Sequence, residues 1–462
     1  MKTTWSTVLL RAAAAALLCA GPALVAAPAA QAGPPAAPAP GLPGTVDSLV
    51  PAPMLPPVTA PVPPIVGAGT PAAVEALRAA IMPSNVGDPF FDAWPQGLDA
   101  RPDGAVLATR DVTAPTAPLV GGGIAQALQF KVKTTDSSGA PSFATATMLL
   151  PRTPWTGPGT RPVLVNNLPI DALGRACTPG YTMAHGLSFT TTVTDFVPPT
   201  TQLAIQHGYA VLIPDHEGPR MAYAEPYVAG HAILDSIRGL RNLRPAEFGD
   251  SRIAMTGYSG GAIATYGATK LIGSYAPELA GHIVGSALGG VPADFEMLTH
   301  SMNGNLASGL FQAATLGIAR ERPEILELAN NLAQQMATSP LKDQCVYELG
   351  ATGVTLLPIN VMANVLDPLH SPVAEHIYTE MRMPGRRSTA PLYIYNGAQE
   401  FWIPAQGARE LYDEQCRMGV SAVYRAVPGE HAIAALTGYP GAMTWLDQRL
   451  QGQPAPNECG RG

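Results

Sequence analysis

The chain has 462 residues, a formal net charge of −7 and a charged fraction of only 13%. Nucleic-acid-binding domains usually present a basic surface, so this composition excludes nucleic acid as an expected partner. Hydrophobic residues make up 47% of the chain, which is enough for a sizeable core in one large domain or two ordinary ones.

The N-terminus has the features of a secretory signal peptide, which we place at residues 1–32. Two basic residues precede an apolar run over residues 12–27, and an Ala-Gln-Ala sequence then provides a cleavage site. The run is short for a membrane span and contains proline, which disfavours a membrane anchor. Lipidation of Cys19 is the alternative, but the preceding Leu18 is too bulky for a good lipidation signal. We therefore expect a secreted protein, either extracellular or associated with the cell envelope.

Residues 33–86 are expected to form a linker. Their first part reads GPPAAPAPGLPG and continues in the same style, and such a composition cannot build a packed core. This stretch would be an extended spacer from the cell envelope or simply an unstructured leader. Residues 72–80 predict one short helix, and the compact domain is expected to start near Gly87.

Six apolar runs, each ending in a loop signal, predict buried strands. They alternate with helical patterns such as TTQLAIQHG and AGHAILDSIRGLRNL. This alternation favours a mostly parallel sheet with helices on both faces, and ligand sites in such sheets lie at the carboxyl ends of the strands. The runs lie at residues 161–169, 208–218, 251–259, 281–290, 391–397 and 421–429.

Residues 256–268 read TGYSGGAIATYGA and place one serine, Ser259, among glycines. A strand is predicted to end just before this serine, and a helix is predicted to begin just after it. An abrupt strand-to-helix turn needs small residues where backbone meets backbone, and Gly-x-Ser-x-Gly is the pattern of a nucleophile elbow. An ordinary turn in a glycine-rich chain can carry the same letters, so this interpretation depends on partners elsewhere.

A serine nucleophile needs a base and an orienting acid, which in an α/β-hydrolase follow in the order Ser, acid, His. His431 lies in PGEHAIAALTG, on a loop directly after the last predicted strand. Glu400 lies in AQEFWIP, after the preceding strand. Asp413 is the alternative acid, in a helical stretch expected to face solvent. His431 would accept the serine proton and the carboxylate would fix its tautomer, so we predict Ser259, Glu400 and His431 as the catalytic residues.

The oxyanion of a tetrahedral intermediate needs two N–H donors. One is expected from Gly260, immediately after the nucleophile, and the other from the loop after an early strand. That loop reads NNLPIDALGRACTPGY, in which Asp171 or Ala172 is the candidate donor.

Four cysteines remain after removal of the signal peptide, namely Cys177, Cys345, Cys416 and Cys459. An even number in an exported protein predicts two disulfides, for which three pairings are possible. A metal site is the alternative, but the sequence has no Cys-x-x-Cys and no close Cys/His cluster. We therefore expect neither a metal nor another cofactor.

Taken in order, several motifs resemble the secretory lipase family of the Candida lipase A type, including its actinobacterial members. The likeness runs from about Gly87 to the C-terminus and implies an α/β-hydrolase fold with a helical cap, acting on carboxylic esters and acylglycerols. The motifs are GYSGGA, IDALGRACTPGY, GYAVLIPDHEG, YVAGHAILDSIRGLRNL, ALGGVPADF, EFWIP and GEHAIAALTG.

The resemblance assigns roles residue by residue. The nucleophile of the family matches Ser259, its histidine matches His431, and its oxyanion residue on the early loop matches Asp171. Its acid is an aspartate four residues before a proline. Here that position is Glu400, four residues before Pro404, so the sequence departs from the family at the acid.

The cap of the family is expected at residues 292–389. Within it, RPEILELANNLAQQM has apolar residues at helical spacing, and GVTLLPINVMANVL is apolar with few charges. These residues would either line an acyl-binding tunnel or only pack the cap onto the sheet. The resemblance also implies a disulfide from the oxyanion loop to the cap, Cys177–Cys345, which leaves Cys416–Cys459.

The expected organisation has five parts. A signal peptide occupies residues 1–32, and a Pro/Ala-rich linker with a short helix occupies residues 33–86. The α/β-hydrolase core would span residues 87–291 and 390–462, with the helical cap at residues 292–389 between its two parts.

The predicted protein is a secreted serine carboxylic-ester hydrolase that cleaves acylglycerols or other lipid esters through an acyl-enzyme on Ser259. One alternative is a short-chain esterase or an acyltransferase of the same fold. Another is a non-catalytic relative that binds lipid or envelope material, which the intact set of Ser259, Glu400 and His431 disfavours. We expect a monomer that takes a lipid or small ester substrate and makes transient contact with a lipid interface.

Overall fold

The computed structural model describes residues 41–55, 70–188 and 199–460, so the expected signal peptide lies outside the described residues. Within these residues a nine-stranded sheet has the order β1-β2-β3-β5-β4-β6-β7-β8-β9. The pairs from β1 to β5 are antiparallel, and those from β5 to β9 are parallel. The strands are β1 (Val106–Asp111), β2 (Ile124–Thr135), β3 (Pro141–Pro151), β4 (Val163–Asn167), β5 (Ala210–Pro214), β6 (Ile253–Tyr258), β7 (Ile283–Gly289), β8 (Leu392–Gly397) and β9 (Ala422–Val427).

The six predicted strands correspond to β4 to β9. β4, β5 and β8 are buried along their whole length, which explains why their sequences are continuously apolar and not alternating. We predict no strand before residue 161, whereas the structure has β1, β2 and β3 there. The mostly parallel sheet nevertheless confirms the predicted fold class.

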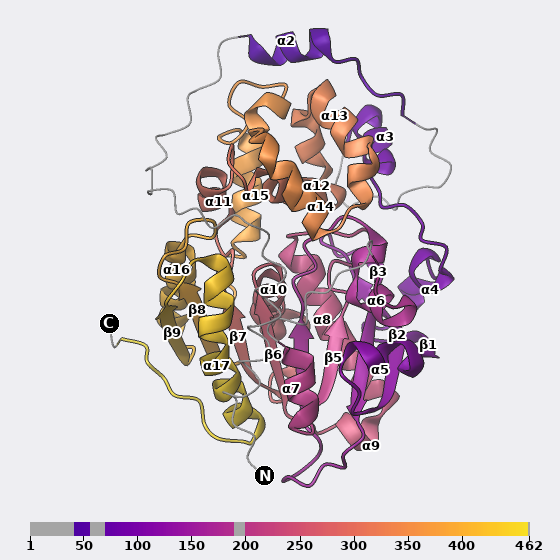
Figure 1. Ribbon diagram of the computed structural model, residues 1–462, viewed down its shortest axis with the longest axis vertical. Helices are drawn as coiled ribbons and strands as arrows, with labels where there is room; N and C mark the ends of the chain where they lie inside the picture. Colours follow the sequence, from indigo (N-terminus) through magenta and orange to yellow (C-terminus); the bar gives the residue numbers. More distant parts are fainter. Residues whose placement is uncertain (1–40, 56–69, 189–198, 461–462) are drawn as a thin grey trace.

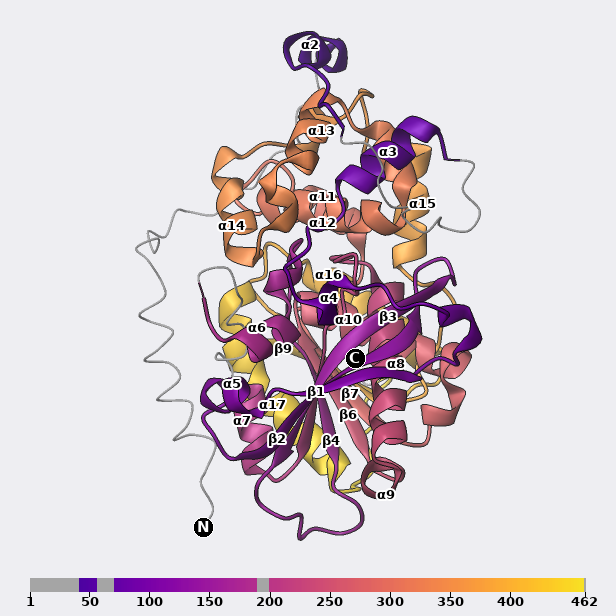
Figure 2. The ribbon, with the colours of Figure 1, turned by 90° about the vertical axis from the view of Figure 1, so that its right-hand side faces the viewer.

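Helices cover both faces of the sheet (Figure 2). One core cluster joins α8, α10 and α16 to one face, and a second joins α7 and α17 to the other. The helices of this part are α4 (Pro89–Asp92), α5 (Thr113–Leu119), α6 (Pro179–His185), α7 (Thr200–Gln206), α8 (Pro226–Leu243), α9 (Pro245–Phe248), α10 (Gly260–Tyr275), α16 (Ala405–Arg417) and α17 (His431–Leu450). Short 3-10 helices are η1 (Leu98–Ala100), η2 (Arg175–Cys177) and η3 (Pro277–Leu279).

A helical cap follows β7 and precedes β8, and it lies above one end of the sheet (Figure 1). Its helices lie within residues 295–381, between the two strands. Its α-helices are α11 (Phe295–Ser301), α12 (Ser308–Glu321), α13 (Asn331–Thr338), α14 (Val346–Ala351) and α15 (Pro372–Met381). Its 3-10 helices are η4 (Pro323–Leu328), η5 (Pro340–Asp343), η6 (Thr352–Thr355) and η7 (Ile359–Met362).

One helical pattern in the cap is broken in the structure. The stretch RPEILELANNLAQQM forms η4 and then α13, with Asn330 between them. The Asn330 side chain accepts a hydrogen bond from Ala333 N and donates to the backbone oxygens of Val361 and Ala363. Asparagine at an N-cap starts a new helix in this way, so the apolar spacing continues while the helix does not.

The expected linker is not extended over its described residues 41–55, because it contains a helix. Residues 42–49 form a helix, α2 (Leu42–Leu49), which begins with a leucine and a proline. Proline at the first helical positions costs no hydrogen bond, which is why a proline-containing stretch can be helical here. The segment binds the cap, because Asn331 N donates to Asp47 Oδ1 at 2.8 Å and Asn331 Nδ2 donates to Val50 O at 2.8 Å.

The compact part of the chain begins earlier than the expected Gly87. The predicted short helix is present as α3 (Ala72–Ala80), and it packs on the cap. Leu77 and Ile81 are buried against Ala319 and Leu326. The apolar face of α3 therefore belongs to the folded protein, and the expected boundary is corrected to the start of this helix.

Two disulfides join distant parts of the chain, with the pairings Cys177–Cys345 and Cys416–Cys459 that the resemblance implied. The first connects the loop after β4 to the cap, across 168 residues of sequence. Among the residues that the structure describes, the helices are all too short or too polar to span a lipid bilayer.

Candidate active site

Ser259 occupies a sharp turn between β6 and α10. Its backbone φ is 53°, in the left-handed region that side chains other than glycine rarely adopt. Glycines make this turn possible: a Cβ on Gly257 would lie 2.0 Å from Gly261 O, and one on Gly261 would lie 2.0 Å from Asn167 O. The geometry is that of a nucleophile elbow, with the serine at the carboxyl end of a central strand.

His431 and Glu400 meet Ser259 in one chain of hydrogen bonds. His431 begins α17 directly after β9, and its Nε2 lies 2.9 Å from Ser259 Oγ. Its Nδ1 lies 2.7 Å from Glu400 Oε2. The three residues that were predicted from separate motifs are thus in mutual contact, in the arrangement by which a base is oriented by an acid.

The two carboxylate oxygens of Glu400 have separate partners. Oε1 accepts hydrogen bonds from the backbone N–H groups of Phe401, Trp402 and Ile403 at 2.9–3.1 Å, while Oε2 faces His431. Burial alone would raise the pKa of Glu400, but the contact with His431 and the backbone amides outweigh it and lower the pKa. Although the side chain is fully buried, these contacts hold it as an anion beside the imidazole.

Asp413, the alternative acid, does not approach the histidine. It lies on α16 with its side chain 47% exposed and pairs with Arg409 one helical turn away. The loop after β8 therefore supplies the carboxylate, and the helix that follows does not.

Tyr258 supports the histidine from the strand side. Its hydroxyl donates to the backbone oxygen of His431, and the two rings pack with centroids 5.1 Å apart. Burial raises the pKa of Tyr258, so this hydroxyl remains a donor. Our sequence interpretation gave Tyr258 no role, although its place beside the nucleophile was a signal for one.

The oxyanion loop brings Asp171 next to Gly260. Asp171 has a φ of 49° and is buried, and a Cβ added to Gly260 would lie 1.6 Å from Asp171 Oδ1. The Glu217 carboxyl accepts hydrogen bonds from the backbone N–H of Ala172, at 3.4 Å to Oε1, and from the backbone N–H of Asp171, so both amides are directed at Glu217 and the carboxyl group of Asp171 is what faces Gly260. Asp171, which was predicted as an oxyanion residue, is the group beside Gly260.

Two buried carboxyl groups lie close together here, that of Asp171 in the loop and that of Glu217 beside it. Burial raises the pKa of Asp171 to about 7, against the opposing effect of His431. Burial and the neighbouring Asp171 raise the pKa of Glu217 well above its ordinary value. Burial and both carboxyls likewise raise the pKa of the Tyr223 hydroxyl. The site is therefore one in which Asp171 can stay neutral at or below neutral pH.

A cavity of about 790 Å³ lies over the serine, between the core and the cap. Its floor includes Ser259, Gly260, Asp171 and His431, and its walls are largely apolar side chains of the cap such as Phe311 and Ile377. A space of this size with largely apolar walls suits a hydrocarbon chain. Within the described part of the chain, no group of three or more His, Cys, Asp or Glu residues could hold a metal ion.

A mostly parallel sheet with a serine elbow after β6 and a cap before β8 defines an α/β-hydrolase. The chain belongs to the secretory lipase family, whose sequence model matches residues 183–458. The resemblance stated from the motifs is therefore confirmed, and the chain is a lipase of the carboxylic-ester hydrolase class. The family is secretory, which supports an extracellular location.

Individual relatives cover most of the chain. Lipase 4 of Candida albicans is 27% identical over 403 residues, which is 82% of this chain and 83% of that protein. A probable inactive lipase of Mycobacterium tuberculosis is 28% identical over 386 residues, covering 81% and 84% respectively. The crystal structure of Candida antarctica lipase A in its closed state matches with a TM-score of 0.74 and 27% identity, over 81% of this chain and 88% of that one.

Proposed function

We propose that the chain hydrolyses lipid esters through an acyl-enzyme on Ser259. The observation that carries the proposal is the chain of hydrogen bonds from Ser259 through His431 to Glu400 at the floor of an apolar cavity. His431 Nε2 would accept the serine proton as Oγ attacks the ester carbonyl carbon. The same nitrogen then returns the proton to the leaving alcohol.

The second half of the reaction reverses these roles. Water enters in place of the alcohol and attacks the acyl carbon while His431 removes its proton. The bond from the acyl carbon to Ser259 Oγ then breaks, His431 returns the proton to Oγ, and the acyl group leaves as a fatty acid. Glu400 stabilises the imidazolium in both halves, because its Oε2 lies 2.7 Å from Nδ1. An alcohol in place of water would give acyl transfer instead, which the same residues support.

The negative charge that forms on the carbonyl oxygen needs donors. We assign the backbone N–H of Gly260 as one donor and the neutral carboxyl group of Asp171 as the second, since Asp171 Oδ1 is the atom that lies directly beside Gly260. A neutral Asp171 carboxyl would add no negative charge to this position, which the raised pKa supports.

Replacement of Ser259 tests the nucleophile. Ser259→Ala should lower ester turnover by about 10⁴-fold or more while the thermal midpoint of unfolding stays close to wild type. An organophosphonate should label the wild-type serine and not the variant. A folded variant that keeps more than about a tenth of the activity, or an unlabelled wild-type protein, would rule out the proposal and favour the non-catalytic binding alternative.

The length of the acyl chain separates a lipase from a short-chain esterase. The apolar cavity supports long acyl chains, so kcat/KM on p-nitrophenyl esters should rise from acetate towards longer chains. A maximum at acetate with a steep fall beyond butyrate would favour the short-chain esterase.

We further propose that the cap touches a lipid surface through one apolar segment. Residues 349–366 carry no charged side chain, and the inner side of the segment contributes Ile359 and Met362 to the cavity wall. Its outer side exposes Val354 and Leu356, which are 74% and 49% exposed. One segment would therefore meet the lipid aggregate on one side and line the cavity on the other.

Charged substitutions test this contact. Val354→Asp with Leu356→Asp should lower the rate on emulsified triacylglycerol at least about tenfold relative to the rate on a dissolved short ester. Leu187→Asp is the matched control, because Leu187 is also 49% exposed but lies after α6 in the core. Equal ratios in all three proteins would contradict the contact.

Cell fractionation would show whether the exported chain is free in the medium or held at the envelope, and gel filtration would test the expected monomer.

A further inference from the structure

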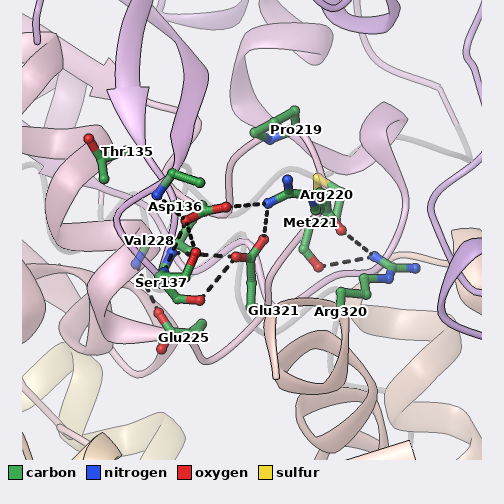
Figure 3. A network of polar contacts seen from close by, with 12 residues as sticks. Thr135, Asp136, Ser137, Pro219, Arg220, Met221, Glu225, Val228, Arg320 and Glu321 are labelled. Carbon is green, nitrogen blue, oxygen red and sulfur yellow. Dashed lines mark hydrogen bonds and ion pairs between the residues drawn. The ribbon is translucent and has the colours of Figure 1, made fainter. Parts of the chain in front are cut away.

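Arg320 of the cap has no exposed surface, although it lies in the last turn of α12 among charged residues. Its guanidinium donates hydrogen bonds to backbone carbonyl oxygens of several separate segments. Two of these bonds, to Arg220 O and Met221 O, are drawn in Figure 3. The five acceptors are Ile81 O at 3.0 Å, Leu173 O at 2.8 Å, Arg220 O at 2.9 Å, Met221 O at 3.0 Å and Lys342 O at 2.7 Å.

A fully buried cation restricts the positions of the carbonyl groups that bind it. Burial lowers the pKa of Arg320 to about 9, against the opposing charges of Asp343 and Glu217, so it stays cationic at neutral pH. A buried charge loses its hydration and depends on the hydrogen bonds that replace it. Movement of any one carbonyl away from the guanidinium would therefore be unfavourable.

Of the acceptor segments, one is part of the oxyanion loop and another supports that loop. Leu173 lies two residues after Asp171, and the cap holds its peptide groups on both sides: Leu173 N donates to Gln344 O at 3.0 Å, while Leu173 O accepts from Arg320. The segment of Arg220 and Met221 begins with Glu217, whose carboxyl accepts from Ala172 N. Arg320 thus binds both the oxyanion loop and the segment that supports it.

The backbone of these segments is not in a relaxed conformation. Asp171 and Met221 have φ values of 49° and 52°, although neither is a glycine. Left-handed backbone at such residues persists only where the surroundings impose it. The carbonyl contacts of Arg320, together with the Cys177–Cys345 disulfide, are such a constraint.

The neighbouring charged residues attach the same helix end at other points. Glu321 accepts from Arg220 Nη1 at 2.9 Å, and Arg220 also pairs with Asp136 (Figure 3). Arg322 pairs with Glu225, which caps α8. These contacts hold the cap on the core, whereas those of Arg320 reach the loop beside the serine.

We propose that Arg320 is a positioning residue for the oxyanion hole, holding Asp171 beside Gly260 through the carbonyl groups of Leu173 and Met221. The inference rests on the proposed function, because it assigns Arg320 to the same hydrolytic site. It makes the cap a part of the catalytic machinery and not only a cover for the acyl chain.

Arg320→Met and Arg320→Lys, with Arg322→Met as the matched control, test the inference in the full mature chain. A p-nitrophenyl ester gives kcat and KM, and a trifluoromethyl ketone gives the affinity for a tetrahedral adduct. In Arg320→Met, kcat should fall about 10- to 100-fold and the ketone should bind weaker by a similar factor, while KM stays within about twofold. Arg320→Lys keeps the charge and should recover part of both.

Arg322→Met should lower the thermal midpoint of unfolding and leave kcat close to wild type. Wild-type kcat and ketone affinity in folded Arg320→Met, or the same losses in Arg322→Met, would overturn the positioning role. If Arg320→Met does not fold, Arg320→Lys carries the same comparison, because it keeps the buried cation but not the fork of donors. Residual activity in Ser259→Ala would instead show that the proposed site itself is wrong.

Discussion

Glu400→Gln is the sharpest test of the proposed acid, because the two side chains have the same size and differ in charge and donors. The amide has one oxygen in place of the two of the carboxylate. In the wild-type site, Oε1 accepts from three backbone N–H groups and Oε2 faces His431 Nδ1. The single oxygen of glutamine must take the place of Oε1, because an NH₂ group there would oppose three donors.

The NH₂ group of the variant then faces Nδ1. That nitrogen can accept its hydrogen bond only if it carries no proton, so the proton of neutral His431 moves to Nε2. Nε2 lies 2.9 Å from Ser259 Oγ and would now present a proton where the reaction needs a lone pair. The imidazolium that forms during catalysis also loses its charge partner.

The expected loss in kcat is about 10²- to 10⁴-fold, the upper figure being the effect of the same type of change in a well-studied serine protease. This corresponds to about 3–5 kcal/mol in activation free energy. The assay is hydrolysis of a p-nitrophenyl ester, with thermal unfolding to show that the variant is folded. Glu400→Asp, whose carboxylate is one methylene shorter, should retain intermediate activity.

Asp413→Asn is the control, since Asp413 is exposed and pairs only at the surface with Arg409. Its activity should equal that of the wild-type enzyme. A Glu400→Gln enzyme of near-normal kcat beside a crippled Asp413→Asn enzyme would refute the assignment.

Three further outcomes follow from the site. Burial raises the pKa of the Asp171 carboxyl to about 7, so kcat should fall above pH 7 as the carboxyl ionises beside the oxyanion; Asp171→Asn should lose this fall, and an unchanged pH–rate profile would contradict it. Replacing Cys177 and Cys345 with alanine opens a link across 168 residues and should lower the free energy of unfolding in denaturant by about 5 kcal/mol, whereas a loss under 1 kcal/mol would be inconsistent with the loop-closure model. Gly261→Ala places a Cβ 2.0 Å from Asn167 O and should destabilise the fold by about 1–3 kcal/mol, as measured by the thermal midpoint; an unchanged midpoint would show that the elbow has room.

β4 to β9 could be predicted from the sequence because helices cover both faces of these strands. Their sequences are therefore apolar runs and do not alternate between apolar and polar residues. β2 was missed for the opposite reason. It carries Gln129, Lys131 and Lys133 among apolar residues, which is typical of a solvated strand. In the structure Lys131 is covered, its Nζ bonding Ala93 O and lying 4.3 Å from the Phe143 ring centroid. Such burial depends on residues far away in sequence.

The same limit applies to the site. Ser259, Glu400 and His431 each follow a predicted strand, so the topology alone brings them to one edge of the sheet. Arg320 stands in a run of four charged residues within residues 320–324, which by pattern belongs on a solvated surface. The packing of the cap against the loop after β4, the segment of Arg220 and Met221, and the end of α3 buries it, and composition carries no signal for such packing. The burial of Glu217 likewise could not be predicted from the sequence.

Because the cap lies between β7 and β8, the catalytic site can be completed only after the cap and the strands that follow it have folded. The nucleophile precedes its base by 172 residues, and the cap lies between them in the chain. A chain folded only as far as the cap therefore holds Ser259 without His431. The loop of Glu400 and the first turn of α17 complete the site only when almost the whole chain is folded.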